Sequence, residues 1–111
     1  MSLPVAAREV AKAWLKAVNH ADVAQLRAVY ARDAVFEHVT EGRVAGRDAV
    51  EALLATRAAD TLHALNLLED GEWAILEWRD TQGRRGCDLF NIRYGRIVVH
   101  RRYEGHWDMK S

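Results

Sequence analysis

The first half of the chain has the hydrophobic spacing of helices. Between Val5 and Val18 the hydrophobic residues recur every three or four positions, which predicts one buried helical face. Asp22 is a good N-cap for a second, shorter helix with hydrophobic residues on one side as far as Tyr30. A third helix is expected to begin near Asp48.

A strand is expected between the second and third helices. Residues 34–40 alternate between two sides, with Phe36 and His38 on the same side. Gly42 and Gly46 then bracket a turn or a short strand.

After about residue 60 the hydrophobic period changes to two, which is typical of strands. Asp70-Gly71, Gln82-Gly83 and Tyr94-Gly95 are turn signals between the strands. The four expected strands are Thr61–Glu69, Glu72–Asp80, Arg85–Tyr94 and Arg96–Trp107. Helices followed by a meander predict one α+β domain over residues 1–111, with three N-terminal helices packed on a curved antiparallel sheet.

Composition narrows the classes of function. The 111 residues are 50% hydrophobic, so one core is expected, and a homodimer would add buried surface at this small size. The net charge is zero, which argues against nucleic acid as a partner. Between Arg84 and Arg102, however, six arginines accompany one acid, Asp88. This excess is interpreted as a solvated sheet face or dimer rim; the alternative is a site for an anionic ligand or nucleic acid.

Cellular location and cofactors are predicted from what the sequence contains. A single cysteine, Cys87, suits a reducing cytoplasm. The opening residues lack a signal-peptide pattern, and no hydrophobic run is long enough for a membrane span. The histidines do not have metal-site spacing, so we expect a cytoplasmic protein with no metal or cofactor.

Asp88 and His38 are the candidate catalytic residues. Asp88 shares a strand face with Phe90, so burial is expected to raise its pKa and keep it protonated as a hydrogen-bond donor. The alternative is a structural aspartate held by Arg79 or by a backbone amide. His38 follows Phe36 on one side of its strand and could exchange a proton near neutral pH; the alternative is a satisfied buried polar residue.

Large aromatic side chains are the candidates for contact with a ligand. Trp14 lies on the hydrophobic side of the first helix, where its indole N–H could donate to a ligand or the ring could simply fill the core. The predicted substrate-binding residues are Trp14, Phe36, Trp78, Phe90 and Tyr103.

Three segments resemble a known superfamily. W-L-K-A-V-N-H-A-D (Trp14–Asp22), Y-A-R-D-A-V-F-E-H (Tyr30–His38) and C-D-L-F-N-I-R-Y-G-R-I-V (Cys87–Val98) are similar to ketosteroid isomerase. The chain thereby resembles the SnoaL-like and ketosteroid isomerase-like branch of the nuclear transport factor 2-like superfamily. The resemblance implies a cone-shaped α+β fold that encloses an apolar pocket.

The resemblance also implies roles for residues. In ketosteroid isomerase an aspartate is the general base, and a tyrosine and a second aspartate form the oxyanion hole. By position these roles come to His38, Trp14 and Asp88, and only the last keeps the family's residue type. In SnoaL-like cyclases an acidic pocket residue serves as acid and base, a role that Asp88 could take. Limonene epoxide hydrolases resemble the segment 95–104 but carry a carboxylate in place of Arg102, so epoxide hydrolysis is not expected.

Two functions remain open from the sequence. The first is a cofactor-free enzyme that transfers protons on a small hydrophobic carbonyl compound, as an isomerase, cyclase or dehydratase. The second is a non-catalytic module of the same fold that binds a small ligand or forms a dimeric interaction surface.

Overall fold

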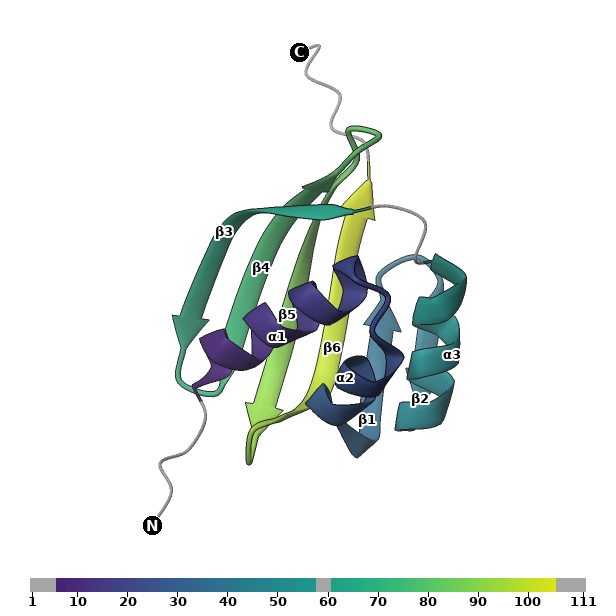
Figure 1. Cartoon of the computed structure of the whole chain (residues 1–111), viewed down its shortest axis with the longest axis vertical. Coiled ribbons are helices and arrows are strands. Elements are labelled where there is room, and N and C mark those ends of the chain that lie inside the picture. The colour runs from purple at the N-terminus through teal and green to yellow at the C-terminus, as the bar shows by residue number, and fades with distance from the viewer. Residues whose placement is uncertain (1–5, 58–60, 106–111) are drawn as a thin grey trace.

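The computed structural model describes residues 6–57 and 61–105. Three helices, α1 (Ala7–Asn19), α2 (Val23–Val29) and α3 (Arg47–Arg57), lie on the concave side of one curved sheet (Figure 1). The strands are β1 (Tyr30–His38), β2 (Gly42–Ala45), β3 (Leu62–Asp70), β4 (Trp73–Asp80), β5 (Arg85–Arg93) and β6 (Arg96–Gly105). The α+β prediction and the four late strands are confirmed; residues 106 and 107 of the last predicted strand lie outside the described residues.

The six strands are ordered β2-β1-β6-β5-β4-β3. Strands β3 to β6 form the expected antiparallel meander, but β1 runs parallel to β6. The sheet is therefore mixed, and the prediction of a wholly antiparallel sheet is wrong. The reason is the path of the chain, because the meander begins at the edge far from β1 and returns until β6 lies beside it.

Local chemistry explains where the helices begin and end. Asp22 accepts a hydrogen bond from the backbone N–H of Gln25, 3.1 Å away, so the predicted N-cap of α2 is confirmed. The side chain of Asn19 exchanges two hydrogen bonds of 2.9 Å with the backbone of Leu62, which ties the end of α1 to the start of β3. Tyr30, predicted to end the second helix, is instead the first residue of β1, because its backbone is already extended (φ −96°, ψ 139°).

The core lies between the helices and the concave face of the sheet. Helix α1 packs against β3, β4 and β5, and α3 packs against β1. Trp14, Tyr30, Phe36, Trp78 and Phe90 are the largest fully buried hydrophobic side chains. Within residues 6–57 and 61–105, no helix is long and apolar enough to cross a membrane.

Candidate functional site

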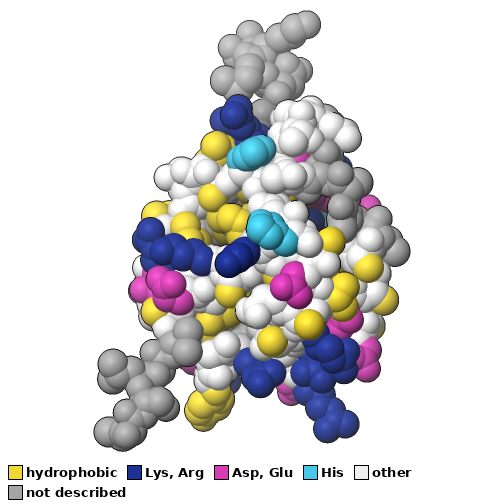
Figure 2. Space-filling model, viewed as in Figure 1, with side chains coloured by type: hydrophobic (Ala, Val, Ile, Leu, Met, Phe, Trp, Pro, Cys, Tyr) yellow, Lys and Arg dark blue, Asp and Glu magenta, His cyan; other side chains and the backbone are white. Residues whose placement is uncertain are grey.

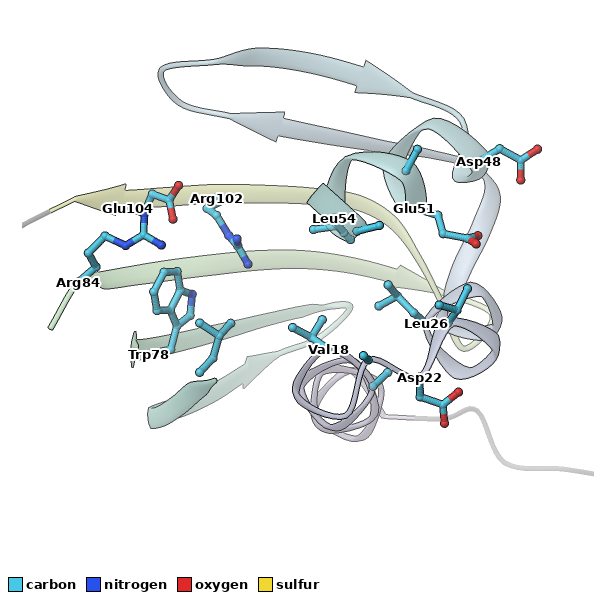
Figure 3. Close-up of a pocket in the computed structure, with 16 residues that line it drawn as sticks. Val18, Asp22, Leu26, Asp48, Glu51, Leu54, Trp78, Arg84, Arg102 and Glu104 are labelled. Carbon is cyan, nitrogen blue, oxygen red and sulfur yellow. The ribbon is translucent and has the colours of Figure 1, made fainter. Parts of the chain in front are cut away.

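A pocket of about 550 Å³ opens between the helices and one end of the sheet. Its walls are apolar in the middle, where Val18, Leu26 and Leu54 lie, and charged at both ends (Figure 3). At the sheet end Trp78, Arg84, Arg102 and Glu104 gather from β4, the β4–β5 turn and β6. At the helical end the lining residues include Asp22, Asp48 and Glu51.

Arg102 is held in place by Asp88. The two residues are directly opposite each other on β6 and β5, and both side chains face the concave side of the sheet. Arg102 Nε donates to Asp88 Oδ1 over 2.8 Å, and Nη2 donates to Oδ2 over 3.1 Å. This two-point contact fixes the guanidinium plane, while Nη1 donates to no residue in the described part of the chain.

The expected protonated state of Asp88 is wrong. Burial alone raises the pKa of this carboxyl group, but the charge and hydrogen bonds of Arg102 outweigh burial and bring the pKa below its ordinary range. Asp88 is therefore an acceptor rather than an acidic donor. It is fully buried behind Arg102 and does not line the pocket.

Trp78 completes the support of this ion pair. Its indole N–H donates to Asp88 Oδ2 over 2.9 Å, and the guanidinium carbon of Arg102 lies 5.2 Å from the centre of its ring. A cation over an aromatic face is stabilised by the ring electrons. Trp78 also lines the pocket, so the predicted contact of this residue with a ligand keeps a structural basis.

A chain of buried polar groups lies behind Asp88. Trp14 donates its indole N–H to the hydroxyl of Tyr30 over 2.8 Å, and that hydroxyl lies 2.7 Å from Nδ1 of His100. Because indole only donates, the Tyr30 hydroxyl accepts from Trp14 and donates to His100. The proton of neutral His100 is then on Nε2, which lies 3.2 Å from Asp88 Oδ1 but outside hydrogen-bond geometry.

Aromatic rings surround His100 on several sides. The ring centres of Phe90, Phe36 and Trp14 lie 4.5, 4.8 and 5.2 Å from that of His100. Burial lowers the pKa of His100 despite the nearby carboxylate of Asp88, so the imidazole is neutral near pH 7. Burial also raises the pKa of Tyr30, which keeps its hydroxyl protonated.

This enclosure corrects three predicted ligand contacts. Trp14, Phe36 and Phe90 are completely buried and line neither this pocket nor the smaller one beside Arg101. They shield the polar chain from water because their rings fill the core between α1 and the sheet. Tyr103 is 45% exposed and lines a second, shallower pocket of about 420 Å³ beside Arg101.

His38 lies beside the main pocket without lining it. Its Nε2 is 2.7 Å from Oε1 of Glu104, and the backbone N–H of Thr40 donates to its Nδ1 over 3.3 Å. Since Nδ1 accepts, Nε2 carries the proton and donates it to the carboxylate. The group that faces the pocket is thus Glu104, and His38 orients it.

Sequence reasoning missed Arg102, Glu104, Tyr30 and His100. Arg102 was assigned to a solvated arginine-rich segment, although His100, Arg102 and Glu104 alternate along β6 and so share one face. No group of three or more His, Cys, Asp or Glu side chains among the described residues could hold a metal ion. On the helical face shown in Figure 2, cationic and anionic side chains are interspersed and form no continuous basic surface.

Comparisons with known proteins place this chain in a family. The model of the SnoaL-like domain matches residues 11–100, so the chain belongs to the SnoaL-like domain family. None of the curated proteins compared with the chain matches it.

Solved structures share the fold. A nuclear transport factor 2-like protein of unknown function from Cytophaga hutchinsonii superposes with a TM-score of 0.83 at 14% identity, over 95% of both chains. A candidate ketosteroid isomerase from Kribbella flavida has a TM-score of 0.86 at 19% identity, over 95% of this chain and 82% of its own. An M. tuberculosis epoxide hydrolase of the limonene epoxide hydrolase-like type has a TM-score of 0.77 at 24% identity, over 89% and 82%. At these identities the likeness shows the cone-shaped fold, as the resemblance had implied.

Proposed function

We propose that this protein catalyses proton transfer on a small hydrophobic carbonyl compound, with no cofactor in the step. The observation that carries the proposal is the placement of Arg102 and Glu104 two residues apart on β6, both lining one pocket with apolar walls. Residues two apart on a strand are separated by roughly 6.6 Å and face the same side. With that separation, a ligand can place its carbonyl oxygen against Arg102 and the adjacent carbon against Glu104.

The proposed roles follow from the two side chains. Glu104 takes a proton from the carbon next to the carbonyl, and the electrons of that C–H bond move to the carbonyl oxygen. Arg102 stabilises the resulting enolate oxygen, because its guanidinium is always charged and is fixed by Asp88 before reaction. Glu104 then returns the proton to the same carbon or to a conjugated one. His38 is a positioning residue, since it donates to Glu104 and does not line this pocket.

Hydrogen–deuterium exchange into a simple ketone tests the proposal and does not require the natural substrate. The ketone 2-acetylnaphthalene has exchangeable methyl protons and fits within the pocket volume. We expect the protein to accelerate incorporation of deuterium from D₂O into that methyl group, measured by proton NMR. Glu104→Gln and Arg102→Met should each reduce the acceleration by at least about 100-fold. Glu77→Gln, an exposed acid on β4, is the matched control and should behave like the unaltered protein.

A binding module without catalysis is the second candidate. It is supported by the fact that both polar pairs at the sheet end, Asp88–Arg102 and His38–Glu104, are already hydrogen bonded within the protein. Calorimetry separates the two functions. Binding of 2-acetylnaphthalene without accelerated exchange would favour the binding module, and accelerated exchange that survives Glu104→Gln would contradict the role of that carboxylate.

We also retain the homodimer as a proposal. It is supported by large hydrophobic side chains that are partly exposed on the convex face of the sheet, namely Leu68, Trp73 and Tyr103. Light scattering on a size-exclusion column measures the mass in solution. A monomer of 12.6 kDa at micromolar concentration would contradict it.

A further inference from the structure

The convex face of the sheet carries a second pocket of about 420 Å³. It is formed by β2, β1 and β6, which lie side by side in the sheet (Figure 1). Val39 and Tyr103, both exposed, are walls without charge. The proton transfer proposed above takes place on the concave face, so this pocket has no part in it.

Two arginines and one glutamate form a row across this pocket. Glu37 of β1 is the Cα partner of Arg43 on β2 and of Arg101 on β6, so the three side chains share one face of the sheet. All three line the pocket. Neighbouring strands are separated by roughly 4.8 Å, so each guanidinium is carried one strand away from the carboxylate. Among these three residues, two positive charges face one negative charge.

The carboxylate does not satisfy the two guanidinium groups. Arg101 Nε lies 3.5 Å from Glu37 Oε2, outside hydrogen-bond geometry, and has no other acceptor in the described part of the chain. Within residues 6–57 and 61–105, Arg43 forms no ion pair and its side chain is exposed. Both arginines can therefore bind a ligand without breaking a buried contact.

The other charged residues at this pocket, His38 and Arg102, leave that balance unchanged. Their side chains are buried towards the concave face, where His38 contacts Glu104 and Arg102 contacts Asp88. Glu37 and Arg101 precede them on the same strands and point to the opposite side, because successive side chains of a strand alternate. The charge offered on the convex side therefore comes from the row of three.

A phosphate monoester has the chemistry that this row can bind. Near neutral pH it carries close to two negative charges and offers three terminal oxygens as acceptors. Guanidinium groups bind such oxygens through parallel N–H donors. A ligand with one negative charge gains little over the carboxylate of Glu37, which is already present. The second charge of a phosphate monoester is balanced by the second arginine.

We infer that the convex pocket binds small phosphate monoesters that carry a non-polar group. Arg43 and Arg101 hold the phosphate, the non-polar group lies against Val39 and Tyr103, and Glu37 opposes binding by its charge. The site is independent of the proposed function, because it lies on the other face of the sheet.

The convex pocket leaves room for the proposed homodimer. Of the residues that support a dimer, Leu68 and Trp73 lie on β3 and β4 and do not line this pocket, whereas Tyr103 does. The arginine excess in the sequence thus has a specific place, at Arg101.

Phenyl phosphate is the probe that tests the inference. Its affinity is measured at pH 7.5 and low salt from shifts of backbone amide signals in NMR titrations, since salt screens exposed charges. Arg43→Gln and Arg101→Gln should each weaken binding on the order of tenfold. Glu37→Gln removes the opposing charge and should strengthen binding by roughly threefold. Arg79→Gln, at an exposed arginine on the convex side of β4, is the matched control and should bind like the unaltered protein.

Two further ligands separate a phosphate site from other sites. Phenyl sulfate has nearly the same shape but one negative charge fewer, so it should bind several-fold more weakly; equal binding would contradict the preference for phosphate monoesters. A DNA oligonucleotide that bound through Arg43 and Arg101 where phenyl phosphate did not would assign the surface to nucleic acid, and the inference would be wrong. It would also be wrong if phenyl phosphate at millimolar concentration left the signals unshifted, or if both arginine variants bound it unchanged.

Discussion

Trp78 and Gly86 lie directly opposite each other on β4 and β5, and the indole ring of Trp78 occupies the space that a side chain on residue 86 would need. An ideal Cβ on Gly86 would be 2.2 Å from Cζ2 of the indole. The absence of a side chain lets the ring approach the sheet, donate to Asp88 and lie within 5.2 Å of Arg102. Gly86 thus determines how Trp78 sits in the pocket wall.

Replacing Gly86 with alanine should disturb the pocket more than the fold as a whole. The new methyl group would push Trp78 away from the sheet, break its hydrogen bond to Asp88 and move the ring into the pocket. We expect the affinity for 2-acetylnaphthalene to fall by roughly tenfold, since overpacking costs about 1–3 kcal/mol. Gly105→Ala is the matched control because nothing lies within 4 Å of its Cβ position. Equal binding by both variants would show that Trp78 adjusts freely.

The ion pair of Asp88 and Arg102 should dominate the stability of the sheet end. Asp88→Asn leaves an almost fully buried guanidinium without its counter-charge, which should lower the free energy of unfolding by about 3–5 kcal/mol. The double variant Asp88→Asn with Arg102→Met removes both charges and should be more stable than Asp88→Asn alone. Urea unfolding of the single and double variants measures this coupling. Purely additive losses would mean that the two residues do not stabilise each other.

The hydroxyl of Tyr30 connects two buried groups, one of which needs a hydrogen-bond acceptor (Trp14) and the other a donor (His100). Tyr30→Phe leaves the indole N–H of Trp14 without an acceptor and Nδ1 of His100 without a donor. We expect a loss of about 2 kcal/mol in the free energy of unfolding. Tyr94→Phe, at a fully exposed tyrosine, is the control and should have little effect. If the two variants were equally stable in urea unfolding, the buried hydrogen-bond chain would contribute nothing net.

Stability should decrease as the pH falls below about 6.5 because of His100. Burial lowers the pKa of its imidazole in the folded state below the ordinary value of 6.5, so between the two values the unfolded chain binds the proton and the folded protein does not. The contribution of His100 is therefore complete above pH 6.5 and is lost as the pH falls towards the folded-state pKa, by at most about 1.4 kcal/mol per pH unit.

His100→Gln tests this pH dependence. The variant should show a flatter pH profile of the unfolding free energy between pH 7.5 and 5, whatever its absolute stability. His20→Gln, at an exposed position, should keep the profile of the unaltered protein. A profile that stays equally steep in His100→Gln would assign the dependence to other groups.

Local patterns in the sequence predicted most elements and the orientation of β5. Alternation placed Asp88 and Phe90 on one face, and both are fully buried there. The same alternation holds in β6, where it points Arg102 inward and Arg101 outward, but the sequence interpretation placed both arginines on a solvated face. Of two consecutive arginines, the sequence does not show which one points inward until the inner face of the strand is known. A buried arginine is also rare unless it has a partner.

The residues of the site come together through the pairing of β1 with β6, and no local sequence pattern predicts that pairing. His38 and Arg102 are Cα partners because β1 lies parallel to β6, and that contact spans more than half of the chain. The same pairing brings Glu104 within 2.7 Å of His38. Without it, the sequence could nominate His38 as a base but could not show that its proton is directed to a carboxylate. Likewise, hydrophobicity alone could not tell core aromatics such as Phe36 from pocket walls such as Trp78.

The central position of β6 has a consequence for how the molecule folds. Strand β6 is the last strand of the described chain, yet it lies between β1 and β5 and pairs with both. Until it inserts, β1 and β5 expose unpaired edges, and Asp88 has no cation to offset its burial. Pairing of β6 therefore closes the sheet and neutralises the buried charge in one step, which favours all-or-none folding. An intermediate that contained the helices and β1 to β5 would have neither a complete sheet nor a site.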